Sequence, residues 1–148
     1  LPQSANITFI GQIAKSVEEV ELLSSTKKSL NLKKIQIIQE LALPETIVCE
    51  LSLNTTIRFL LCYRVPDYDY VHANKLTSLL TWAASCPHPL IFLGDLNLPL
   101  INWTLNECTS EPIHATLYNA VTTLGLDQVV TNNTRLNNCL DLIFCNSS

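Results

Sequence analysis

Hydrophobic residues in the first half of the chain gather in short runs with the spacing of β-strands. The runs at 46–53 (TIVCELSL) and 57–65 (IRFLLCYRV) are rich in β-branched and aromatic residues, and the polar segment between them predicts a hairpin. Every second residue of the first run is apolar, which predicts a strand buried on one face. The apolar segments 7–14 and 35–38 are further candidate strands.

Two later segments have the spacing of amphipathic helices. In the first, apolar residues recur at i, i+3, i+4 and i+7 on one helical face, at Leu76, Leu79, Leu80 and Ala83. The segment 66–69 supplies an Asp as its N-cap, and the prolines within 86–89 end it. We expect the second helix at 113–124, with Gly125 as its C-terminal stop.

Three more strands complete the pattern. The run at 90–93 is apolar at every position, which predicts a central strand with polar residues at its carboxyl end. We expect a short strand at 127–130 and a final strand at 139–145. Because an antiparallel hairpin comes first and strand–helix–strand units follow, the predicted fold class is α/β (or α+β) with layered packing.

The composition fits one globular domain, or part of one. The chain has 148 residues, of which 47% are hydrophobic and 15% charged, so it can build a packed core. Its formal net charge of −4 argues against binding nucleic acid through a broad basic surface, so any polyanion site must be local or metal-assisted. The sequence has no apolar run of membrane-spanning length and no signal-peptide pattern at its start, so we expect an intracellular chain that is not secreted.

The six cysteines form no CxxC pair, and most lie in or beside apolar, strand-like runs. We expect reduced core thiols, with disulfides as the alternative. The spacing of Cys and His fits no common zinc site.

The segment Gly94-Asp95-Leu96-Asn97 follows the apolar strand directly. On an extended segment, the side chains of Asp95 and Asn97 point the same way, so an acceptor and a donor would converge on one ligand. Asp can orient or deprotonate a water, and Asn can donate to a phosphate oxygen. The alternative is a simple turn, because Gly, Asp and Asn all favour turns.

Two other segments carry candidate chemistry. The strand at 57–65 ends in Tyr63 and Arg64, which could bind phosphate, although a surface ion pair of Arg64 with Asp67 is the alternative. Asp141 lies in an otherwise apolar run. It either needs a cation, metal or histidine partner or lies near a strand end, and the sequence leaves both alternatives open.

In this order and spacing, three segments resemble the endonuclease/exonuclease/phosphatase superfamily, in particular the apurinic-like endonuclease domain of non-LTR retrotransposons. They are CYRVP (62–66), PLIFLGDLNLPLINW (89–103) and TNNTRLNNCLDLIF (131–144). The resemblance implies a partial two-layered α/β sandwich whose N-terminal half is missing. It makes 32–148 the C-terminal part of such a domain and leaves 1–31 unassigned.

The resemblance also implies roles for individual residues. Asp95 would orient or activate the attacking water, Asn97 would hold the scissile phosphate, and Tyr63 would contact it. Asp141 would orient a histidine. The residues that would bind the substrate are Arg64, Arg135 and Thr134.

A divalent cation, Mg²⁺ or Mn²⁺, would assist catalysis in such a domain, with Asp95 as a possible ligand. The family's metal-binding Glu and its catalytic His have no counterpart in the 148 residues, so we expect weak or absent metal binding. The implied partners are DNA, the other half of the same domain and a reverse transcriptase in the parent protein; a membrane is not among them. An active form would be nuclear.

The family's usual Phe between Asp and Asn is Leu96 here, and Leu136 stands where a glycine often follows Thr-Arg. Three functions remain open. The first is a DNA-nicking phosphodiester hydrolase, the second a catalytically inactive retroelement remnant, and the third a phosphatase of the same superfamily. The retroelement-like segments disfavour the phosphatase.

Overall fold

A computed structural model describes residues 31–134 and 138–146. The candidate strand at 7–14 and Arg135 therefore lie outside the described residues. The elements are, in chain order, β1 (Asn31–Ile35), the 3₁₀ turn η1 (Gln39–Leu41), β2 (Thr46–Ser52), β3 (Thr56–Tyr63), α2 (Tyr70–Ala84), β4 (Leu90–Asp95), β5 (Ile101–Asn102), β6 (Glu107–Cys108), α3 (Pro112–Thr123), β7 (Leu126–Gln128) and β8 (Asp141–Asn146).

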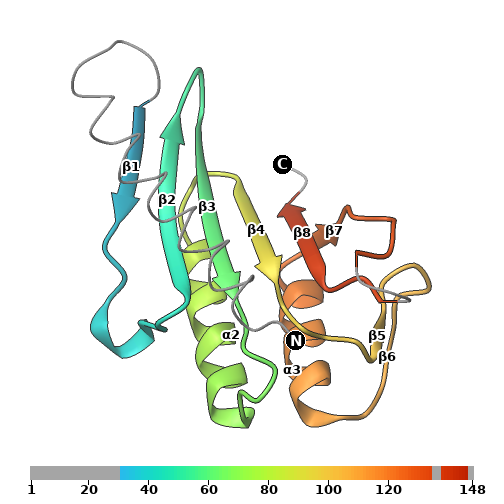
Figure 1. The fold of residues 1–148 in the computed structure, drawn as a ribbon. Helices are drawn as coiled ribbons and strands as arrows, with labels where there is room; N and C mark the ends of the chain where they lie inside the picture. The colour runs from blue at the N-terminus through green and yellow to red at the C-terminus, as the bar shows by residue number, and fades with distance from the viewer. Residues whose placement is uncertain (1–30, 135–137, 147–148) are drawn as a thin grey trace.

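Six of the strands in the described ranges form one mixed sheet in the order β1-β2-β3-β4-β8-β7. The β2–β3 pair is the predicted antiparallel hairpin, and β3 and β4 are parallel, joined by α2. The strand β8 pairs antiparallel with β4 on one side and β7 on the other. Helices α2 and α3 pack against each other on one face of the sheet (Figure 1). The predicted α/β class, as a partial sandwich, is confirmed.

The main core lies between the sheet and these two helices. It joins the predicted apolar face of α2 to the central strands, and its fully buried members include Leu60, Leu79, Leu80, Phe92 and Phe144. The rings of Phe92 and Phe144 stack across β4 and β8 with their centroids 5.5 Å apart. Each such side chain contributes about 1.5–3 kcal/mol on burial, so this layer fixes the order of the central strands.

The other face of the sheet is also apolar. Ile47, Cys49 and Leu61 form a second buried cluster there, while Val48 points to the helix side and is equally buried. The prediction that the first run is buried on one face is therefore wrong for the start of β2. The reason is that both faces of β2 meet apolar residues, so alternation of polarity gives no guide to its buried side.

Helix ends follow their local chemistry. The Asp69 side chain accepts a hydrogen bond from the backbone N–H of His72 at the start of α2, as predicted. Glu111 caps α3 in the same way, and Gly125 follows that helix with φ at 63°. In the described part of the chain, no helix is both long and apolar enough to cross a membrane.

Several strand bounds differ from the expected ones. The first strand covers Asn31–Ile35 rather than 35–38, and β7 and β8 are each displaced by one or two residues. The two-residue strands β5 and β6 were not predicted, because segments this short carry no periodic signal. All six cysteines are free; Cys49 and Cys62 are buried in the core, and the other four are partly exposed.

Candidate functional site

The three motifs meet at one edge of the sheet. Because β3 and β4 are parallel, their carboxyl ends coincide, and Tyr63 pairs in register with Asp95. Asp95 in turn pairs with Asp141, the first residue of β8. Residues in register across neighbouring strands point to the same face, so these three side chains form a row on the face away from the helices.

The members of this row differ in burial. Tyr63 is 4% exposed and Asp95 8%, whereas Asp141 is exposed at the start of its strand. The strand-end alternative for Asp141 is therefore the one that the structure shows.

Asn97 does not lie on an extended segment, so this prediction is wrong. Its φ is 48°, in the left-handed region, and the chain turns directly after β4. Its backbone N–H donates to Oδ1 of Asp95 at 3.3 Å, and its amide Nδ2 donates to the carbonyl of Arg64 at 2.7 Å. The turn alternative describes this backbone, but the amide still has a second N–H to offer a ligand.

Arg64 lies in the interior, 3% exposed. Its Nη1 donates to the carbonyls of Leu96 and Asn97 at 3.4 and 3.2 Å, and its Nη2 to the carbonyl of Tyr68 at 3.1 Å. The alternative of a surface pair with Asp67 does not match this geometry, because the guanidinium is directed into these carbonyls. Burial lowers the pKa of Arg64, opposed by the charges of Cys62 and Glu111.

The predicted contact of Arg64 with a DNA backbone would require the guanidinium to leave three carbonyl groups. In the structure it joins the loop after β3 to the turn after β4. Sequence reasoning missed this arrangement, because its acceptors are backbone carbonyls that no side-chain pattern reveals.

Thr134 closes the loop that leads into β8. Its Oγ1 accepts hydrogen bonds from the backbone N–H groups of Leu140 and Asp141, both at 3.0 Å. The backbone N–H of Leu96 donates to the carbonyl of Leu140 at 2.9 Å, so this loop and the turn after β4 lie side by side. Thr134 thereby fixes where Asp141 enters the sheet.

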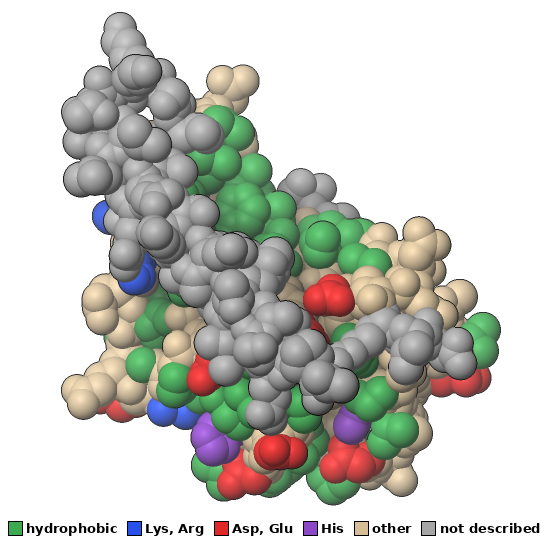
Figure 2. All heavy atoms as spheres, viewed as in Figure 1, with side chains coloured by type: hydrophobic (Ala, Val, Ile, Leu, Met, Phe, Trp, Pro, Cys, Tyr) green, Lys and Arg blue, Asp and Glu red, His purple; other side chains and the backbone are tan. Residues whose placement is uncertain are grey.

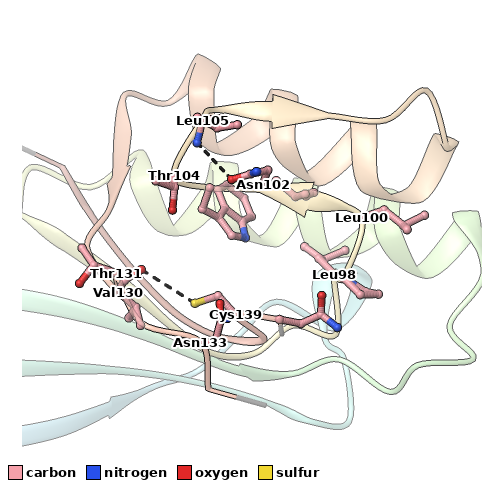
Figure 3. A pocket seen from close by; sticks show the side chains of 13 residues that line it. Leu98, Leu100, Asn102, Thr104, Leu105, Val130, Thr131, Asn133 and Cys139 are labelled. Atoms are coloured by element: carbon pink, nitrogen blue, oxygen red, sulfur yellow. Dashed lines mark hydrogen bonds between the residues drawn. The ribbon is translucent and has the colours of Figure 1, made fainter. Parts of the chain in front are cut away.

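A pocket of about 470 Å³ lies next to this edge, between the segment 98–105 and the segments 130–133 and 138–139 (Figure 3). Its lining combines amides and hydroxyls with an apolar wall, and among the described residues no charged side chain contributes to it. Its size is in the usual range for ligand pockets. In the described part of the visible face, the few Lys and Arg side chains lie along the left side, and most of the acidic ones lie toward the lower edge (Figure 2).

A metal site is not complete in the part of the chain that the structure covers. No three His, Cys, Asp or Glu side chains within residues 31–134 and 138–146 are placed to hold an ion. Mg²⁺ binds through one or two carboxylates together with waters and substrate phosphates. Asp95 and Asp141 are two carboxylates at paired positions, and these two residues alone do not make such a site.

The chain is similar in structure to solved proteins. No protein-family model and no curated protein sequence matches the chain. The endonuclease domain of TRAS1, a telomere-specific non-LTR retrotransposon, matches with a TM-score of 0.57 and 22% identity, over 78% of this chain and 54% of that one.

Two further solved structures match at lower TM-scores. An endonuclease/exonuclease/phosphatase family protein from Leptotrichia buccalis C-1013-b has a TM-score of 0.44 and 14% identity, over 81% of this chain and 50% of its own. The human Nocturnin catalytic domain with bound sulfate anion has a TM-score of 0.40 and 16% identity, over 79% and 47%. The chain therefore spans about half the length of these solved domains.

The chain has a partial endonuclease/exonuclease/phosphatase fold. Over the matched part, this chain shares its fold with the TRAS1 retrotransposon endonuclease domain, as the resemblance of the sequence motifs predicts.

Proposed function

We propose that this chain carries the C-terminal part of a nuclease site that hydrolyses phosphodiester bonds in DNA. The observation that supports the proposal is the row of Tyr63, Asp95 and Asp141, with Asn97 on the adjacent turn, in a chain with the fold of a retrotransposon endonuclease domain. The origin of the chain in a reverse transcriptase polyprotein, and its location in the nucleus, belong to the same proposal.

In the proposed reaction, the oxygen of a water bonds to phosphorus while one P–O ester bond breaks. The carboxylate of Asp95 orients this water and accepts its proton, and the leaving oxygen takes up a proton from solvent. The second N–H of the Asn97 amide donates to a non-bridging phosphate oxygen, and Tyr63 contacts the same phosphate. We derive no step through a metal ion, because the described residues do not complete a site for one.

The pocket favours nucleic acid over a small phosphate ester as substrate. Leu98, on its wall, is three residues from Asp95, so at most about 10 Å of chain separates them. The described residues of this lining offer amides, hydroxyls and apolar groups, which suit the nucleoside next to a phosphate.

A plasmid-nicking assay tests the proposal. The 148-residue chain is incubated with supercoiled plasmid and Mg²⁺, and with EDTA as the metal control. We expect nicking by the wild-type chain, and the EDTA arm shows whether it requires a divalent cation. Replacing Asp95→Asn should reduce it about 100-fold or more, since a positioned general base contributes at least that much.

The matched control is Asp67→Asn, which removes one exposed carboxylate from the loop after β3 and should leave nicking unchanged. If the wild-type chain does not nick above the Asp95→Asn background, the proposal fails and the chain is a catalytically inactive remnant. If phosphate monoesters are hydrolysed and plasmid is not, the chain is a phosphatase.

A further inference from the structure

Arg64 exchanges hydrogen bonds with the turn after β4 in both directions. Its backbone N–H donates to the carbonyl of Asp95 at 2.9 Å, and its own carbonyl accepts from Nδ2 of Asn97 at 2.7 Å. Its guanidinium donates to the carbonyls of Leu96 and Asn97. Three consecutive residues, from the end of β4 into the turn after it, are thus bonded to the residue that directly follows β3.

We propose that Arg64 is a positioning residue: it holds the turn so that the Asp95 carboxylate and the Asn97 amide face the same phosphodiester. The inference rests on the proposed function, and it assigns to Arg64 a role other than DNA binding. Arg64 acts through Asn97 and does not touch the substrate.

The conformation of Asn97 explains why the turn needs such a residue. Its φ of 48° lies in the left-handed region, which costs an L-residue about 1–2 kcal/mol, although Asn tolerates it better than most. A turn that its own sequence favours only weakly is set by its partners. The partners of Asn97 are Arg64 and Asp95. The Asn97 carbonyl accepts from the Arg64 guanidinium, its side-chain amide donates to the Arg64 carbonyl, and its backbone N–H donates to the Asp95 carboxylate.

The guanidinium suits this task because one rigid group carries several hydrogen-bond donors. Its planar fork reaches the carbonyls of Leu96 and Asn97 with Nη1 and that of Tyr68 with Nη2, so one side chain fixes two loops. The phenol of Tyr68 in turn bonds to Glu45, which anchors the second loop to the start of β2. A lysine keeps the charge but has one ammonium group, which cannot hold both loops in this geometry.

Hydrogen exchange tests the positioning role without any need for catalysis. The backbone N–H groups of Leu96 and Asn97 are bonded to the carbonyl of Leu140 and to the Asp95 carboxylate. In Arg64→Lys, we expect exchange at these two amides to rise about tenfold, corresponding to the loss of about one hydrogen bond, while exchange in α2 stays unchanged. Unchanged exchange at both amides would overturn the proposal, as would an equal rise throughout the chain.

Kinetics on plasmid DNA separate positioning from DNA binding. For Arg64→Lys we expect kcat to fall about 10- to 100-fold with KM unchanged, because a misplaced group costs rate rather than affinity. A phosphate contact predicts instead a raised KM and a salt slope that is shallower by about 0.9. That second result would refute positioning. Lys33→Gln, which removes an exposed charge from β1, is the control and should change neither.

A double-mutant cycle shows whether Arg64 acts through Asn97. Asn97→Gly keeps the positive φ and the backbone carbonyl that Arg64 binds, and removes the amide. Adding Arg64→Lys to it should therefore lower kcat by less than Arg64→Lys does alone, because only the positioning of Asp95 is left to lose. Fully multiplicative effects would contradict the proposed route. If wild type does not nick at all, the nuclease proposal fails by itself, and the exchange experiment still decides whether Arg64 orders the turn.

Discussion

Gly94 is the residue of the site whose substitution has the most calculable result. It lies on β4 directly before Asp95, in register with Cys62 of β3, with φ at 154°. A Cβ built on Gly94 would lie 1.7 Å from the carbonyl oxygen of Cys62, half the 3.4 Å at which ordinary van der Waals contact begins. The obstacle is backbone in the middle of the sheet, so it cannot rotate away.

We therefore expect Gly94→Ala to force β3 and β4 apart. Separation would break neighbouring backbone bonds such as that from the N–H of Arg64 to the carbonyl of Asp95, each contributing about 0.5–1.5 kcal/mol. Forced displacement of packed core residues adds about 1–3 kcal/mol. With the backbone strain at this φ, about 1–2 kcal/mol, the expected loss is about 4 kcal/mol or more. That is a large part of the stability of an ordinary domain.

Gly125→Ala is the matched control, because Gly125 also has a positive φ, 63°, but no atom lies within 4 Å of its Cβ position. It should lose only the strain of about 1–2 kcal/mol. Urea unfolding followed by circular dichroism gives both free energies of unfolding. The reasoning is refuted if Gly94→Ala lies within about 1 kcal/mol of Gly125→Ala, since the close approach then contributes nothing.

Three further predictions concern single groups. Hydrogen bonds from the backbone and ring of His114 lower the pKa of Glu111, so this carboxylate stabilises the fold above its ordinary pKa and loses that effect as pH falls through its lowered value. The difference in melting temperature between wild type and Glu111→Gln should therefore shrink from pH 6 to pH 3; a constant difference would contradict the pairing. Burial raises the pKa of the Cys62 thiol to about 12, so iodoacetamide at pH 8 should alkylate it far more slowly in native than in urea-unfolded protein, as peptide mapping would show. Arg58→Met removes hydrogen bonds to Glu50 across the β2–β3 hairpin and should cost about 1.5–3 kcal/mol in urea unfolding, whereas a loss under 0.5 kcal/mol would show that solvent screens the pair.

The sequence was informative where one periodic signal dominated. The spacing of Leu76, Leu79 and Leu80 places α2, and the two β-rich runs around residues 54–56 place the hairpin, because in both cases burial of one set of side chains decides the structure. The motif order also brings Asp95 and Asp141 to the same edge. That juxtaposition depends on β8 pairing with β4 across the 45 residues from 96 to 140, which only the resemblance to a known fold could indicate.

The geometry of the candidate site depends on hydrogen bonds and close contacts with backbone groups. A pattern of side chains does not predict these. Arg64 looks like a surface cation until the carbonyls of Leu96 and Asn97 are in place beside it. Asn97 favours turns, but the partners that select its positive φ are backbone and side-chain groups far along the chain, which the sequence does not indicate. Gly94 reads as a turn residue, yet it lies within β4, and the approach of the Cys62 carbonyl explains it.

The burial of Arg64 also bears on the acidic composition. A nuclease that binds DNA through many surface cations needs a basic face. This chain has more acidic residues than basic ones, with 13 Asp and Glu against 9 Lys and Arg. One of those nine cations, Arg64, is buried inside the fold. It donates hydrogen bonds to backbone carbonyl groups there and orders the turn next to Asp95 and Asn97. The proposed site thus relies on oriented amide donors, and on a pocket whose described lining residues are uncharged, to bind a phosphodiester, and little on counterion release. Such a site can be built on an acidic chain, because its specificity for phosphate comes from where a few groups are held rather than from how many charges surround them.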